Sequence, residues 1–221
     1  MNSTEGNEFV HFDEYEDAVA AIELVGSQSV DVQKRPSQWK WIIMAMQNAV
    51  QGAMVLALSG TDGCGALAPK SQQRIRAWLH HLSPDRPPRV MAPYDVSLER
   101  IMKSELMEGP VPDLSAEDCR NLQRLNEMRR QFVHFNPTGW GIELNYILNI
   151  MPVALNLFEF LTTTAAVLAA VKGTSLRDGQ GRPNIHFTEE HRARMKRALA
   201  QARAAVEAFK EKTGGPEARG N

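Results

Sequence analysis

The spacing of apolar residues is the feature that most constrains how this chain folds. Between five stretches rich in glycine and proline, apolar residues recur every three to four positions, the period of an α-helix. No stretch alternates between apolar and polar residues over the length of a strand, as a half-buried strand would. The sequence therefore predicts an all-α protein with loops near residues 60–69, 83–93, 109–112, 136–139 and 173–183.

The same spacing places the expected helices. Ser37 is the expected cap of the second helix, and Ser115 with Asp118 has the form of a capping box at the start of the fifth. Pro152 is expected to lie near the first turn of the sixth helix or to kink it. The prediction is a bundle of four to five core helices with extra short helices, at residues 14–27, 37–58, 71–82, 96–107 and 115–135, then an apolar helix that ends by residue 172, and 188–212.

Length and composition favour one globular domain. The chain has 221 residues, 43% of them hydrophobic and 23% charged, which is enough to bury a core and excludes wholesale disorder. We expect residues 1–35, an acidic segment with the first helix, to belong to the same domain as the bundle at 36–212. Residues 213–221 are an expected disordered tail. Two cysteines without CxxC spacing exclude a disulfide framework and a four-cysteine zinc site.

Two apolar stretches have lengths near that of a membrane span. Residues 41–61 carry no charge, but three amide side chains, Gln47, Asn48 and Gln51, lie in the middle of the stretch and would each need a partner in lipid. Residues 147–171 are interrupted by a proline, an asparagine and a glutamate. Both stretches are interpreted as core helices of a protein without a membrane span. The acidic start is the opposite of a signal peptide, so we expect a cytoplasmic protein.

Charge is distributed unevenly along the chain. The totals are 25 basic and 26 acidic residues, a net charge of -1, which excludes a uniformly basic nucleic-acid coat. Residues 1–31 nevertheless hold eight acids and no base, whereas residues 120–134 hold four arginines against one glutamate, and the last helix is also basic. The basic faces are either ordinary solvated helix surfaces or phosphate-binding surfaces that the acidic segment covers or opposes.

The arginine-rich segment also carries the residues best suited to chemistry. Arg129 and His134 stand near the end of a helix, before Asn136-Pro137. Residues five apart differ by about 140° around a helix, so the two side chains converge only if the helix ends at the histidine or a second chain completes the site. Arg130 is four residues from His134 and shares its face, so either arginine is a candidate.

An arginine and a histidine suit the cleavage of RNA without a metal. The negative end of the helix dipole favours a charged histidine, and histidine changes charge near neutral pH, which suits a general acid or base. His134 would take the proton of the 2′-hydroxyl, and the arginine would stabilise the phosphorane-like oxygens. The alternative is that these cations only stabilise the helix C-terminus.

The segment resembles the HEPN superfamily, helical domains defined by an Arg-x(4–6)-His motif. The similarity includes Arg129-x4-His134, the following Phe135-Asn-Pro-Thr-Gly-Trp140, and the stretch from Trp39 that resembles the family's buried helix. It extends over roughly residues 36–171. The sequence departs from the family at Arg130, where a small polar residue such as asparagine is common.

The resemblance implies a bundle that often dimerises and brings two Arg–His pairs into a shared cleft. Many members are metal-independent endoribonucleases of toxin–antitoxin, defence or RNA-processing systems, and others are inactive binding modules. The expected partners are RNA or a nucleotide, a second copy and an antitoxin-type protein, with no metal or cofactor. The candidate site residues are Arg129 and His134 as the catalytic pair, Arg130 and Arg124 for phosphate, and Gln47, Asn48, Gln51 and Trp140 for the cleft or interface.

A non-catalytic helical module that binds RNA, a nucleotide or a protein through the same basic face is the alternative function.

The other histidines and the glycine-rich stretch give weaker evidence for a functional site. His80 and His81 lack the spacing of a zinc helix, and His186 and His191 have no identifiable further ligands. The glycine-rich stretch at 60–65 lacks the Lys-Ser/Thr end of a P-loop.

Overall fold

The computed structural model describes residues 13–59, 63–107, 109–134, 141–163 and 188–213. These residues are helical apart from turns, short extended segments and one isolated bridge between Leu67 and Met91, so the prediction of an all-α protein is confirmed. The helices are α1 (Glu14–Val30), α2 (Trp39–Leu58), α3 (Pro69–Leu79), α4 (Tyr94–Ile101), α5 (Ala116–Val133), α6 (Leu144–Thr163) and α8 (Glu189–Thr213), with a 3-10 turn, η1, at Pro36–Gln38.

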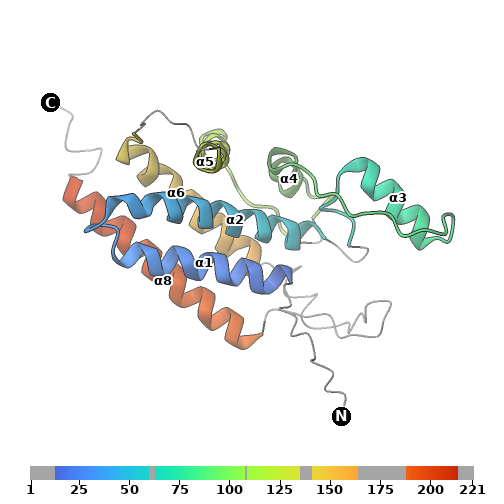
Figure 1. Cartoon of the computed structure of the whole chain (residues 1–221), viewed down its shortest axis with the longest axis horizontal. Helices are drawn as coiled ribbons and strands as arrows, with labels where there is room; N and C mark the ends of the chain where they lie inside the picture. The colour runs from blue at the N-terminus through green and yellow to red at the C-terminus, as the bar shows by residue number, and fades with distance from the viewer. Residues whose placement is uncertain (1–12, 60–62, 108, 135–140, 164–187, 214–221) are drawn as a thin grey trace, which may run out of the picture.

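The bundle is organised around α2. This helix packs against α1, α4, α5 and α6, while α1 lies between α2 and α8 (Figure 1). The apolar residues of α2 surround much of its axis, so this helix can pack against several other helices at once. At the far end of the molecule α3 covers a small separate cluster of Cys64, Leu67 and Ile75 (Figure 1).

Several expected helix bounds and features differ from the structure; the first helix, for example, continues to Val30, and α3 ends at Leu79 instead of residue 82. Ser37 does not cap α2, because Pro36 begins a 3-10 turn that includes Ser37, and α2 follows without a side-chain cap. The helix expected to reach residue 107 ends at Ile101; Met107 is still buried, but from a turn, so its apolar character did not mark a helix. Of the two alternatives for Pro152, a place near the first turn of α6 is excluded, because the proline lies inside the helix, where a kink was the other expectation. The expected end of that helix near residue 172 lies outside the described residues, as do residues 214–221.

The capping box is confirmed. The hydroxyl of Ser115 accepts the backbone N–H of Asp118 at 3.1 Å, and the carboxylate of Asp118 accepts the backbone N–H of Ser115 at 3.0 Å. The two residues satisfy backbone donors that the first turn of α5 leaves without helical partners. This cap fixes where α5 begins.

Two helices are long and apolar enough to cross a membrane by length and composition alone, Pro36–Leu58 and Leu144–Thr163. In their most apolar stretches 61% and 50% of the residues are buried inside the protein. Both helices contribute to the main core, with side chains such as Met46 and Phe158 fully buried. The structure is therefore compatible with a soluble protein.

The acidic first helix is joined to the basic last helix by ion pairs. The guanidinium of Arg194 in α8 donates to both carboxylate oxygens of Glu16 at 2.8 and 3.0 Å and of Glu23 at 2.5 and 2.9 Å. His191 Nε2 lies 3.1 Å from Glu16 as well. Part of the charge imbalance along the sequence is thus cancelled across the interface of α1 and α8.

These pairs predict a pH-dependent stability. Hydrogen bonds from Arg194 lower the pKa of Glu16 and of Glu23 below the ordinary value of 4.5. The folded state then binds fewer protons than the unfolded chain, so the pairs stabilise the fold above about pH 4.5 and this stabilisation is lost as the pH falls through the lowered pKa values. In urea unfolding between pH 3 and pH 6, Arg194→Leu should be clearly less stable than the parent protein at pH 6, and the difference should become smaller as the pH falls toward 3. A stability difference that is equal at both pH values would contradict this role.

Candidate functional site

The end of α5 carries the predicted catalytic residues. The helix ends at His134, whose backbone N–H donates to the carbonyl of Arg130 at 3.0 Å and whose ψ of 85° leaves the helical region. Arg129 is half-buried, whereas Arg130 and His134 are exposed. One of the two conditions for Arg129 and His134 to converge, a helix that ends at the histidine, is therefore met.

The cations of this last turn differ from the arginines nearer the start of α5. Arg120 donates to Glu117 at 2.5 Å, and Arg124 lies 3.4 Å from Glu117 and 5.5 Å from the centre of the Tyr146 ring. In contrast, the structure gives the side chains of Arg129, Arg130 and His134 no hydrogen bond or ion pair with another residue that it describes. No described acidic residue thus pairs with the positive charge at the end of α5, where this charge also complements the helix dipole.

Arg124 lies apart from this end. It is ten residues before His134, which corresponds to about 15 Å along a helix axis. Its donors reach Glu117 and the side-chain oxygen of Asn121 at 3.2 Å. The partners of Arg124 therefore lie in α5 itself and in α6. The structure does not bring Arg124 to the Arg129–His134 end of the helix.

Two contacts set how α5 lies along α2. The ammonium of Lys40 lies 5.9 Å from the ring centre of Phe132, and the amide nitrogen of Gln47 donates to Asn126 Oδ1 at 3.3 Å. Both contacts join the first half of α2 to the second half of α5, and Figure 1 shows α5 nearly end-on while α2 lies across the page, so the two helices cross at a steep angle. Arg129 lies between Asn126 and Phe132 in the sequence, in the part of α5 that contacts α2.

A polar cluster follows on from Arg129 along this interface. Gln47 is only 1% exposed and donates to Gln51 at 2.8 Å as well as to Asn126. Asn126 is three residues before Arg129 and therefore on a neighbouring part of the same helix face. The structure brings Gln47 and Gln51 together, leaves Asn48 exposed on another face of α2, and adds Asn126, which the sequence analysis did not single out. Trp140 lies outside the described residues.

Apolar side chains are exposed beside this cluster. Trp41 of α2 is 51% exposed and Val133 of α5 is 45% exposed. Trp41, Met44 and Asn48 follow one another at helical spacing along a face of α2 that is exposed or half-buried. We call Trp41, Met44, Asn48 and Val133 the α2–α5 face.

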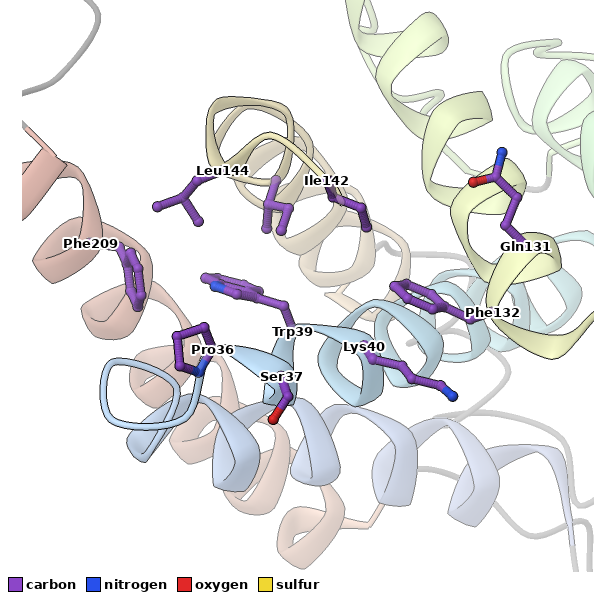
Figure 2. Close-up of a pocket in the computed structure, with 10 residues that line it drawn as sticks. Pro36, Ser37, Trp39, Lys40, Gln131, Phe132, Ile142, Leu144 and Phe209 are labelled. Atoms are coloured by element: carbon purple, nitrogen blue, oxygen red, sulfur yellow. The ribbon is translucent and has the colours of Figure 1, made fainter. Parts of the chain in front are cut away.

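A pocket lies at the end of the bundle, next to the end of α5. Its volume is about 460 Å³, and it opens between the starts of α2 and α6 and the ends of α5 and α8 (Figure 2). Gln131 and Phe132, between the motif arginines and His134 in the sequence, belong to its wall. The described residues that line it are Pro36, Ser37, Trp39, Lys40, Gln131, Phe132, Ile142, Leu144, Ile147 and Phe209. Sequence analysis missed this pocket.

The histidines outside α5 have structural partners or positions. His191 takes part in the start of α8, where its Nδ1 accepts the backbone N–H of Thr188 at 3.3 Å. His80 ends α3, and His81 follows it in a left-handed conformation with a φ of 58°. His186 lies outside the described residues. Within the described part of the chain, no three histidine, cysteine, aspartate or glutamate side chains group together as metal ligands would.

Comparison with known proteins gives no relative. No family model, no curated protein and no solved structure matches this chain. The HEPN-like identity therefore stays a prediction from residues 36–171.

Proposed function

We propose that this protein is a HEPN-like, metal-independent endoribonuclease that works in the cytoplasm. The observation that carries the proposal is the end of α5, where Arg129, Arg130 and His134 surround a helix end without acidic partners among the described residues. An uncompensated cationic site suits a phosphodiester, since a phosphate supplies the charge and the acceptor oxygens that the protein does not.

In the proposed reaction, His134 removes the proton from the 2′-hydroxyl of a ribose. The 2′-oxygen then attacks the adjacent phosphorus and the bond to the 5′-oxygen breaks, leaving a cyclic phosphate and a 5′-hydroxyl. Arg129 stabilises the charge on the phosphorane oxygens. Arg130 holds a flanking phosphate; Arg124 would do so only for a longer RNA that runs back along α5.

The α2–α5 face supports a homodimer. Trp41 and Val133 are large apolar side chains that solvent reaches although they lie beside the candidate site. A second copy on this face would cover both and bring a second His134 near the first. The second histidine would then supply the proton that the departing 5′-oxygen needs.

The direct test uses purified full-length protein and end-labelled single-stranded RNA, with and without EDTA. We expect cleavage in EDTA with cyclic phosphate ends, and none of an otherwise identical RNA whose 2′-hydroxyls are methylated. Loss of cleavage in EDTA, or equal cleavage of the methylated RNA, would refute the mechanism. Light scattering of the parent protein and Trp41→Glu tests the dimer; the variant should be monomeric and cleave poorly.

The position of Arg130 favours one alternative, a module that binds RNA or a nucleotide without cutting it. Arg130 is exposed where the resembling family commonly has a small polar residue. Such a module would show salt-sensitive binding, unchanged in His134→Ala, and no cleavage.

A further inference from the structure

The pocket at the end of the bundle has the properties of a small-molecule site. Its volume of about 460 Å³ lies within the range of roughly 300–1,000 Å³ that is typical of ligand pockets. Most of its lining is apolar, with side chains such as Phe132, Ile147 and Phe209 from three different helices. In Figure 2 the side chains of Phe209, Leu144 and Phe132 lie around the indole of Trp39. A molecule here would be enclosed by helix ends rather than lie on one helix face.

One polar group in this pocket has no partner. Trp39 is only 5% exposed, and its indole nitrogen is buried without a hydrogen-bond acceptor. The ring meets Phe209 edge to face, with ring centres 5.5 Å apart, and in Figure 2 the nitrogen lies at the end of the ring that faces Phe209 and Pro36. Buried donors in proteins are nearly always paired, and no described residue accepts this one, so a bound molecule with an acceptor would satisfy it.

The charge of the lining selects the kind of acceptor. Among the described residues of the lining, Lys40 is the one charged residue and none is acidic. The starts of α2 and α6 and the ends of α5 and α8 all border the pocket, so positive and negative dipole ends offset each other there. The charge of Lys40 is therefore what favours an anion over a cation in this pocket.

We propose that this pocket binds a small carboxylic acid with an apolar body. The carboxylate accepts the indole N–H of Trp39, and the apolar body lies against Ile147, Phe132 and Phe209. This site is separate from the RNA site, and the proposal does not depend on RNA cleavage.

The test follows the indole N–H signals of ¹⁵N-labelled full-length protein during titration with octanoate. The chain has four tryptophans, and Trp39→Phe identifies the Trp39 signal as the one that disappears. We expect octanoate to move this signal downfield, octanol to bind more weakly, and octylammonium to leave it unmoved. No movement with octanoate up to its solubility limit, or equal binding of octylammonium, would overturn the proposal.

Variants test the contact itself by calorimetry. Trp39→Phe should weaken octanoate binding about tenfold, since it removes one charge-assisted hydrogen bond but keeps an aromatic ring. Trp41→Phe is the matched control, two residues away and exposed, and should bind as the parent does. Leu144→Trp, which fills the pocket, should abolish binding even if Trp39→Phe folds poorly. Unchanged binding in Leu144→Trp would place the ligand elsewhere.

Discussion

Replacing His134 with alanine should lower the rate of EDTA-resistant RNA cleavage at least 100-fold, and Arg129→Met should do the same. The expected losses follow from removing a general base and a group that stabilises transition-state charge, which each contribute about 100-fold or more. A 100-fold loss corresponds to about 2.7 kcal/mol of transition-state stabilisation. Methionine is chosen for Arg129 because this side chain is half-buried beside α2 and its stem contributes to packing. Single-turnover cleavage of a labelled RNA measures both losses.

Arg120→Gln is the matched control for these two variants. It removes an arginine from the same helix, but one that is exposed and paired with Glu117. We expect less than a threefold change in cleavage, because an exposed ion pair contributes little to stability and Arg120 lies more than three turns from His134. Thermal unfolding should show that all three variants are folded. If His134→Ala and Arg129→Met cleave as fast as Arg120→Gln does, the proposed site is wrong.

The sequence predicted those parts of the fold that local chemistry decides. The capping box at Ser115 and the end of α5 before Asn136-Pro137 are encoded within a few residues, and both agree with the structure. The wrong boundaries depend on more distant contacts. Met107 continues the apolar spacing of the helix before it because its side chain is buried in the core, although its backbone lies outside the helix.

The sequence shows the net charge of each segment, but it does not predict which acidic residue pairs with which basic residue. Arg194 meets Glu16 and Glu23, which are 178 and 171 residues away in the chain. Arg203 likewise donates to Glu159 of α6 at 2.5 Å. Arg194 and Arg203 are thus structural contacts between helices, so the interpretation of the last helix as a phosphate surface loses support at these two residues.

The candidate site likewise has a part that the sequence predicts and a part that depends on how the helices pack. The relation of Arg129, Arg130 and His134 is a property of one helix and its end, and spacing was enough to derive it. Asn126 lies three residues from Arg129 in the sequence, but its bond to Gln47 depends on how α5 packs against α2. The pocket around Trp39 is formed by the ends of four helices, and no pattern within one segment of the sequence predicts which helix ends lie together.

Replacing Gly26 with valine should destabilise the protein by about 3 kcal/mol, near the upper end of the usual range for overpacking. Gly26 lies in α1 where it crosses α8, and a Cβ there would lie 2.9 Å from both the Cα and the carbonyl oxygen of Ala198. Those atoms are backbone, so no side-chain rotation relieves the clash and the two helices must separate. Urea unfolding measures the loss.

Gly52→Ala separates this clash from the general effect of a helical glycine. Gly52 also lies inside a helix, but its Cβ would come no closer than 3.4 Å to the Cβ of Ala18, an ordinary contact. Alanine should therefore stabilise at this position by about 0.5–1 kcal/mol through helix propensity. The two glycines thus predict opposite signs, and a Gly26→Val protein as stable as the parent would mean that α1 does not pack on α8 as described. Because Glu16 and Glu23 reach Arg194 only through that packing, Gly26→Val should also weaken the dependence of stability on pH between 3 and 6.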